Sequence, residues 1–168
     1  MSEDTLVIIK PDSFWRHLDR EVEKRLATLG LQLIAACTLS NGDNLNGNNL
    51  PEEKWQEFYY PAISSRPAIL KGTAKYMAHG PVKVIRLRGP DAIQTVRKAV
   101  GATRPWQAEQ GTIRGDFWPG ADEANATYRP KFQQPGDDNF LFNMIHASDS
   151  PASFSREAQF FQQLQPGL

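Results

Sequence analysis

The chain has 168 residues with 19 basic and 19 acidic side chains, so its formal net charge is zero. This balance argues against a basic surface that coats nucleic acid or binds a membrane, and any phosphate chemistry must therefore rely on a local cluster of charges. The length suits one domain with a sizeable core, and apolar and charged shares of 40% and 23% are ordinary for a globular protein.

Cysteine usage and the start of the chain favour a cytosolic protein. Cys37 is the single cysteine, so no intrachain disulfide can form, and its place in LQLIAACTLS predicts a buried strand thiol. One cysteine with three histidines also makes a poor zinc set. The sequence contains neither an apolar stretch long enough to span a bilayer nor a basic start followed by an apolar signal core.

The first part of the chain reads as strand, helix, strand and loop. The β-branched run TLVIIK (5–10) predicts a strand that Pro11 stops. Residues 18–30 predict a helix that ends at Gly30, with one apolar face formed by Leu18, Val22, Leu26 and Leu29. Residues 31–39 predict a second strand, and the Asn/Gly-rich run 40–53 predicts a surface loop.

The middle of the chain continues the alternation. Residues 51–63 predict a helix with acidic residues in its first turn, and a shorter helix is expected within 70–80. VKVIRLRG (82–89) predicts a third strand. Residues 90–101 predict a helix that ends at Gly101 and turns inward Ile93, Val96 and Val100.

The last part begins with a long stretch, 101–138, that is rich in Pro and Gly and largely irregular. NFLFNMIH (139–146) predicts the final strand. A helix follows, with Ser150 as its cap, Pro151 in its first turn and an apolar stripe of Phe154, Ala158, Phe161 and Leu164. This order of elements favours an antiparallel or mixed sheet covered by helices over a doubly wound sheet.

The sequence has no P-loop, no G-x-G-x-x-G turn and no protein-kinase motif set, so phosphate would have to be held by side chains. Candidates are Lys10 at the end of the first strand, Arg97 on the polar side of its helix, Thr103 in the next loop, and Arg114 between two glycines in GTIRGDF. Planar guanidinium groups suit phosphate oxygens, although each residue alone is more often a solvated charge.

His146 follows an apolar run and precedes Ser-Asp-Ser. A lone histidine at a strand end is more often structural, yet a neutral imidazole is a competent nucleophile near pH 7 because its usual pKa is about 6.5. Glu157 in the following helix could orient the ring, and Ser148 could assist it. The other two histidines, His17 and His79, lie in polar stretches and are expected at the surface.

Four segments taken together resemble one family. TLVIIKPD, RPAILKGTAKYMAHGPV, GATRPWQAEQGTIRGDF and NMIHASDSPASFSREAQFF stand in the order found in nucleoside diphosphate kinases, and the resemblance runs from near the N-terminus to about Phe161. The GTIRGDF and N-x-I-H-x-S-D-S stretches are long and unusual enough to make chance a poor explanation. The resemblance favours the enzymatic interpretation of His146 over the structural one.

The resemblance implies a ferredoxin-like α/β sandwich in a single domain over 1–168. Its four-stranded antiparallel sheet would have helices on one face and additional segments around it. It also implies transfer of the γ-phosphoryl group of a nucleoside triphosphate to a nucleoside diphosphate, by a ping-pong route through phosphohistidine. Mg²⁺ would arrive through the nucleotide phosphates, so no metal site of the protein's own is expected. A homo-oligomer with loose base specificity, no membrane contact and no specific nucleic acid partner is expected as well.

Residue roles follow from the same matched motifs. His146 would be the nucleophile, Glu157 and Ser148 would orient it, and Lys10 would assist catalysis. Phosphates and sugar would be held by Lys10, Tyr60, Arg97, Thr103, Arg114 and Asn143. Ala68 stands at the family's base-contacting position.

Three departures from the family pattern stand out. Ala68 and Ile69 replace an aromatic residue that stacks on the base, an interaction worth about 1–3 kcal/mol, so binding is expected to be weaker unless another ring substitutes. Insertions are expected near 40–50 and 118–140. The second contains Trp118, Tyr128, Phe132 and Phe140, is either a surface loop or an interface or folded flap, and puts the family's usual hexamer in doubt.

Two other classes remain as alternatives. The chain could be a nucleotide-binding module that has lost turnover, and formation of phosphohistidine would decide between the two. It could also be an RNA-binding ferredoxin-like domain, but NFLFNMIH and VKVIRLRG offer neither exposed sheet aromatics nor an RNP1-like run.

Overall fold

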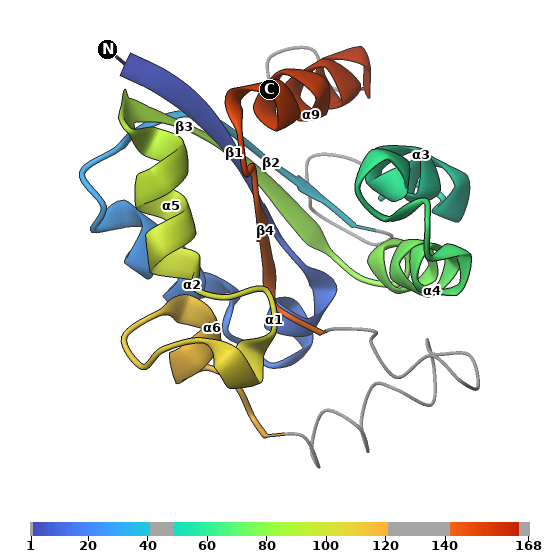
Figure 1. The fold of residues 1–168 in the computed structure, drawn as a ribbon, viewed down its shortest axis with the longest axis horizontal. Helices are drawn as coiled ribbons and strands as arrows, with labels where there is room; N and C mark the ends of the chain where they lie inside the picture. Colours follow the sequence, from blue (N-terminus) through green and yellow to red (C-terminus); the bar gives the residue numbers. More distant parts are fainter. Residues whose placement is uncertain (1, 41–48, 121–141, 165–168) are drawn as a thin grey trace.

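The computed structural model describes residues 2–40, 49–120 and 142–164 and contains one four-stranded sheet (Figure 1). The strands are β1 (Ser2–Ile9), β2 (Gln32–Leu39), β3 (Val82–Pro90) and β4 (Ile145–Ala147). Their spatial order is β2-β3-β1-β4 and every neighbouring pair is antiparallel. The predicted ferredoxin-like class with an antiparallel sheet is therefore confirmed.

Helices cover both faces of this sheet, as Figure 1 shows. In chain order they are α1 (Pro11–Trp15), α2 (Asp19–Ala27), α3 (Glu52–Ile63), α4 (Pro67–Ala78), α5 (Ala92–Val100), the 3-10 helix Pro105–Gln107, α6 (Ile113–Asp116) and α9 (Pro151–Leu164). On the first face α2 and α5 pack on side chains of β1 and β3, such as Val7 and Ile85, through Val22 and Val96.

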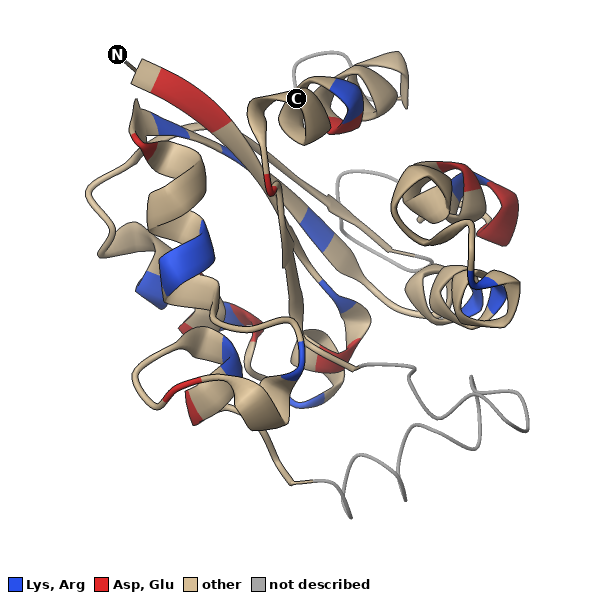
Figure 2. Ribbon diagram, in the orientation of Figure 1, with Lys and Arg blue, Asp and Glu red and all other residues tan. Residues whose placement is uncertain are grey.

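The second face is richer in aromatic residues and is covered by α3, α4 and α9. Alternate residues of β1, Leu6 and Ile8, contact a cluster in which Trp55, Tyr76 and Phe161 are fully buried. The period of two along β1 thus sends successive side chains into two separate cores. Figure 2 shows basic and acidic residues interspersed over the helices of both layers, in line with the zero net charge.

Several predicted elements agree with the structure within a few residues, and others differ for physical reasons. Gly101 has a φ of 86° and ends α5 as expected. The helix α2 ends at Ala27, before Gly30, whose φ of 71° serves the turn into β2 instead. Pro11 does end β1, but it also occupies the first turn of a short helix, α1, which the pattern did not indicate.

The second half shows larger differences. The helix α4 begins at Pro67, earlier than predicted. The irregular stretch after Gly101 contains the short helix α6 around Arg114. Residues 139–141 of the predicted strand 139–146 lie outside the described residues. Over 142–146 the prediction is wrong in extent: β4 begins at Ile145, because Met144 has a left-handed backbone with a φ of 64° that interrupts the extended conformation.

Cys37 is buried in β2 with 7% exposure, and His17 and His79 are exposed, all as predicted. The insertions predicted near 40–50 and 118–140 fall mostly on 41–48 and 121–141, which lie outside the described residues. In the part of the chain that the structure describes, each helix is too short or too polar to cross a membrane.

Candidate active site

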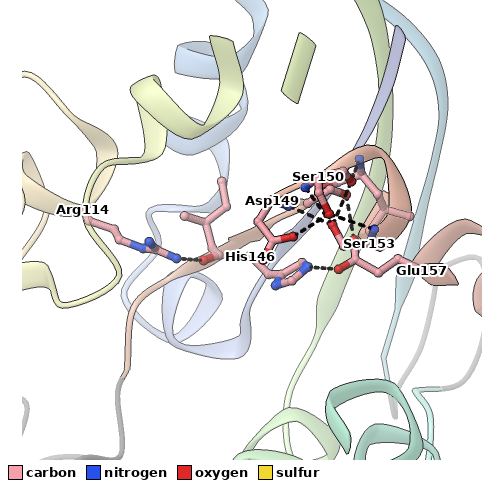
Figure 3. Close-up of polar contacts among 9 residues, drawn as sticks. Arg114, His146, Asp149, Ser150, Ser153 and Glu157 are labelled. Atoms are coloured by element: carbon pink, nitrogen blue, oxygen red, sulfur yellow. Dashed lines mark hydrogen bonds and ion pairs between the residues drawn. The ribbon is translucent and has the colours of Figure 1, made fainter. Parts of the chain in front are cut away.

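The centre of the site is a histidine bonded to a buried carboxylate. His146 lies on β4, opposite Ile8 of β1. Its Nε2 is 2.9 Å from Oε1 of Glu157, and Ser148 donates its hydroxyl proton to Oε2 of the same carboxylate at 2.7 Å. Figure 3 shows the imidazole pointing toward Glu157. Glu157 is 4% exposed, whereas the His146 side chain is 22% exposed and reaches the surface of a cavity.

These contacts determine which ring nitrogen is available for chemistry. A carboxylate accepts hydrogen bonds, so Nε2 of His146 must carry a proton to bond Glu157. In the neutral ring the lone pair then resides on Nδ1. The arrangement therefore provides an imidazole that can attack through Nδ1 while its developing positive charge faces Glu157.

Glu157 is positioned by α9, whose first turn is fixed by reciprocal capping hydrogen bonds between Ser150 and Ser153. The Ser153 N–H donates to Oγ of Ser150 at 3.1 Å, and the Ser150 N–H donates to Oγ of Ser153 at 3.0 Å (Figure 3). Ser150 is thus the cap that the sequence predicted. Ser153, Glu157 and Phe161 are spaced four residues apart and are all buried, so the carboxylate shares the face that packs on the sheet.

Lys10 contributes a buried amino group to the site. Lys10 follows β1, is 7% exposed, and donates from Nζ to Oδ1 of Asn143 at 2.7 Å. Nδ2 of Asn143 in turn donates to the carbonyl of Thr103 at 3.0 Å. Burial, followed by repulsion from Arg114, lowers the pKa of Lys10 from 10.5 to about 7, against a smaller opposing effect of Asp12.

Arg114 ties together the segments around the site. Its guanidinium makes four hydrogen bonds to backbone carbonyls: Nε to Asn143 at 3.1 Å, Nη1 to Gly101 and Ala102 at 3.0 and 3.2 Å, and Nη2 to Ile145 at 2.6 Å. A guanidinium has five N–H groups, so one remains for a phosphate oxygen. Burial, and then the charge of Arg97, lowers the pKa of Arg114 to about 10.

One cavity of about 300 Å³ collects most of the predicted residues. It is lined by His146, Lys10, Arg97, Thr103, Arg114 and Asn143. Ser148 and Glu157 stand behind the histidine. Arg97 is exposed on α5, as its helical position predicts. The cavity wall therefore combines an imidazole with several cations, which suits a bound polyanion such as a phosphate chain.

Of the residues predicted to contact the nucleotide, Tyr60 and Ala68 do not line this cavity. Tyr60 is 61% exposed, and its neighbour Tyr59 lines the cavity instead. Ala68 is exposed, and Ile69 lines the cavity in its place. Motif matching counts residues, but one step along a helix turns the side chain by about 100°. The apolar spacing of Trp55, Phe58 and Tyr59, all buried, was the signal that could have found Tyr59.

Tyr59 also lines the cavity and carries a buried hydroxyl. Its side chain is 7% exposed, and its hydroxyl is buried without a hydrogen-bond partner among the residues that the structure describes. The ring lies edge-on to His146 with centroids 6.1 Å apart, and Nζ of Lys10 is 5.7 Å from the ring centroid. Burial raises the pKa of Tyr59, so the hydroxyl keeps its proton and can donate it to a ligand.

Asp149 was not singled out by the sequence, yet it also lines the cavity, at its exposed rim. Hydrogen bonding to Ser153 and Ser150, with the nearby charges of Arg97 and His146, lowers the pKa of its carboxyl. The described residues contain no group of three or more His, Cys, Asp or Glu that could hold a metal ion.

Fold and site together define a phosphotransferase built on a ferredoxin-like sheet. The family model described as "Nucleoside diphosphate kinase" matches residues 3–165. The chain is 35% identical over 161 residues to the nucleoside diphosphate kinase of Methanosphaera stadtmanae, covering 96% of this chain and 86% of that one. It is 36% identical over 163 residues to that of Thermoanaerobacter sp. (strain X514), covering 96% and 98%. The chain therefore belongs to the nucleoside diphosphate kinase family.

Solved structures agree. A nucleoside-diphosphate kinase from Borrelia burgdorferi, a transition-state mimic with bound vanadate and ADP, aligns with a TM-score of 0.74 at 30% identity, over 95% of this chain and 86% of that one. An NDP kinase from Pyrobaculum aerophilum aligns with a TM-score of 0.73 at 29% identity, over 96% of each chain. The enzyme class inferred from the sequence is confirmed.

The buried ammonium of Lys10 leads to a prediction about stability and pH. Between pH 7 and 10.5 the unfolded chain holds a proton on Lys10 that the folded chain releases, so the contribution of this residue to the free energy of unfolding rises with pH across that window. We expect Lys10→Met to be more stable than the parent by a few kcal/mol near pH 6.5, in the range of about 1.4 kcal/mol per pKa unit, with the gain shrinking toward pH 10.

Urea denaturation at several pH values measures this difference. Lys71→Met is the matched control because it makes the same chemical change at an exposed lysine of α4. A gain from Lys10→Met that stays constant across the window would contradict the prediction.

Proposed function

We propose that this nucleoside diphosphate kinase works by a ping-pong mechanism through phosphohistidine at His146. The observation that carries the proposal is the bond between Nε2 of His146 and the buried Glu157 carboxylate, in a residue that lines the cation-rich cavity. That bond makes Nδ1 the nucleophilic nitrogen and fixes the orientation of the ring. The second hydrogen bond, from Ser148 to Glu157, keeps the carboxylate from turning away.

In the first half-reaction the Nδ1 lone pair forms a bond to the γ-phosphorus of a nucleoside triphosphate. The bond from that phosphorus to the β,γ-bridging oxygen breaks, and its electron pair leaves on the nucleoside diphosphate. The phosphorylated ring, still protonated at Nε2, is cationic and faces Glu157. A second nucleoside diphosphate then reverses the step by attacking through its terminal oxygen, so the two transfers are nearly equal in energy.

Cations of the cavity neutralise the charge of the moving group. Lys10 supplies an ammonium, Arg114 its one uncommitted N–H, and Arg97 a guanidinium from α5. The hydroxyls of Thr103 and Tyr59 are available as donors. Transfer of a phosphoryl group needs mainly such positioning and charge stabilisation. Mg²⁺, held through the nucleotide phosphates, would add charge neutralisation when it is bound.

The sugar and base would extend along the apolar part of the cavity. Ile63 and Ile69 from the α3–α4 pair and Val100 from α5 line it. Ile69 follows Ala68 in the segment where the family has a stacking aromatic. Aliphatic side chains offer no hydrogen bonds that distinguish one base from another. Loose base preference with modest nucleotide affinity is therefore expected.

We propose a homo-oligomer with β2 at the subunit interface. Among the described residues β2 pairs only with β3, so one edge of it has unpaired backbone groups. Leu33 on this strand is 61% exposed, and exposed edge strands pair readily with other chains. The remaining proposals are one domain over 1–168 with insertions near 40–50 and 118–140, a cytosolic location, and no specific nucleic acid partner; the family match over residues 3–165 supports the first.

Formation of the phosphoenzyme tests the mechanism directly. The protein is mixed with Mg·ATP, its intact mass is taken under alkaline conditions, and GDP is then added. We expect one acid-labile phosphoryl group that leaves as GTP. His146→Ala should abolish both events, whereas His79→Ala, which changes an exposed histidine, should abolish neither. Nucleotide binding without a phosphoenzyme would instead indicate a binding module without turnover.

The two neighbouring tyrosines give a matched pair of variants. Tyr59→Phe removes a buried hydroxyl that can donate to phosphate, and a hydrogen bond to a charged group is worth about 1.5–3 kcal/mol, so kcat/KM should fall by about 10- to 100-fold. The same change should leave the free protein as stable as the parent or more so, because the hydroxyl has no partner among the described residues. Tyr60→Phe should leave kcat/KM unchanged, and the opposite ranking would return the role to Tyr60.

The oligomer proposal predicts the effect of a charge on the β2 edge. We expect light scattering after size exclusion to give a multiple of the mass of one chain, and Leu33→Lys to lower it. Trp106→Lys, at another exposed apolar residue with 50% exposure, should leave the mass unchanged. Dissociation by Trp106→Lys and not by Leu33→Lys would locate the interface elsewhere.

A further inference from the structure

A buried residue with no assigned role lies directly behind the phosphate end of the cavity. Asp12, in α1, is 1% exposed and does not line the cavity. We propose that Asp12 is a positioning residue for the reaction: held by Tyr76, its carboxylate fixes Met144 in a left-handed backbone conformation and so sets Asn143, Lys10 and Arg114. The inference rests on the proposed function and deepens it, because it names what holds the phosphate-binding cations in place.

The backbone of Met144 has an uncommon conformation. Its φ is 64° and its side chain is 3% exposed. For a residue other than glycine this left-handed conformation is unfavourable, so the surrounding contacts must impose it. Met144 stands between Asn143 and Ile145, one residue before β4.

Hydrogen bonds to both backbone polar groups of Met144 impose this conformation. The Met144 N–H donates to Oδ2 of Asp12 at 3.0 Å. The Met144 carbonyl accepts from Oγ of Ser13 at 2.9 Å and from the Lys10 N–H at 2.8 Å. Both backbone polar groups of Met144 are thus bound by residues 10–13, at the start of α1.

Asp12 is itself held by the hydroxyl of Tyr76. Oδ1 of Asp12 accepts a hydrogen bond from the hydroxyl of Tyr76 in α4, a side chain with 0% exposure. Both carboxylate oxygens therefore accept hydrogen bonds, which is the pattern of the ionised form. Burial raises the pKa of Asp12, while the Tyr76 bond and the charge of Lys10 act in the opposite direction.

The contacts of Met144 with residues 10–13 also affect the site. The two residues that flank Met144 carry contacts of the phosphate-binding cations. Asn143 accepts from Nζ of Lys10 at 2.7 Å, and the carbonyls of Asn143 and Ile145 accept from Arg114 at 3.1 and 2.6 Å. A change of Met144 to an ordinary φ would rotate the peptide groups on either side of it, and with them the groups that orient both cations.

Asp12 also acts on Lys10 through its charge, which a purely structural residue would not do. The charge of Asp12 favours the protonated form of Lys10, against burial and the repulsion of Arg114. The other titratable or charged groups that share the cavity with Lys10 are Tyr59 from α3, Arg66 before α4, Arg97 from α5, and His146 and Asp149 on either side of the end of β4. Removing the Asp12 charge should therefore let Lys10 lose its proton at lower pH.

The test compares three variants of the full chain. In Asp12→Asn the new amide can accept from only one of the two donors, Met144 N–H or Tyr76 hydroxyl, and the charge is gone. Tyr76→Phe removes one of these bonds and keeps the charge. Asp91→Asn makes the same chemical change at an exposed left-handed position, which asparagine tolerates.

We expect Asp12→Asn to raise KM for the nucleoside triphosphate by about 10- to 100-fold, the scale of a misplaced binding group, with a smaller effect on kcat. The alkaline limb of the pH profile of kcat/KM should also move to lower pH. Tyr76→Phe should raise KM less and leave this limb in place, and Asp91→Asn should change neither.

Calorimetric binding of a non-hydrolysable triphosphate, measured as a function of pH, provides the same comparison without turnover. Loss of binding by Asp12→Asn in a parent that binds but does not react would support this inference while overturning the proposed function. If Asp12→Asn lowers the Tm but leaves KM, binding and the pH profile unchanged, Asp12 is structural only and the inference is wrong. If that variant does not fold, unchanged KM and binding in Tyr76→Phe overturn the inference.

Discussion

The site depends on one buried cation, the guanidinium of Arg114, which holds four backbone carbonyls from two segments of the chain. These carbonyls belong to Gly101 and Ala102, just after α5, and to Asn143 and Ile145 on either side of Met144. A buried charge is costly unless its hydrogen bonds are satisfied. The carbonyls satisfy Arg114 without neutralising it, because they carry no net charge. The cavity therefore keeps its positive potential, and an anionic ligand is the partner that completes it.

This arrangement explains why an electrically neutral protein can hold a highly charged substrate. The net charge is zero, yet Lys10 and Arg114 are both below a tenth exposed and face one cavity. Their lowered pKa values record the free energy spent on keeping like charges together away from water. Glu157 plays the complementary part behind His146, where positive charge develops during transfer. Function and stability thus make opposite demands on the same few residues.

Much of the fold could be predicted from the sequence because it depends on local periodicity. The strands β1 to β3 and the helices α2, α5 and α9 follow from apolar spacing and capping residues, and the family motifs indicated His146, Arg114 and Asn143, which line one cavity. Contacts between distant segments were beyond this reasoning. The apolar run NFLFNMIH hides the left-handed backbone at Met144, which is imposed by Asp12, 132 residues away in the sequence. Tyr59 was missed because spacing within a motif does not fix which side of a helix faces the cavity.

The wide separation of the site residues along the chain has a consequence for the life of the protein in a cell. Lys10 follows the first strand, Arg97 lies in α5 and His146 in the last strand, so partly folded chains cannot assemble the cavity. Nucleotides then bind only the native state, and ligand binding of this kind shifts the folding equilibrium by mass action. The concentration of nucleotides in the cell would therefore affect how long each protein molecule survives proteolysis, as well as how fast the enzyme works.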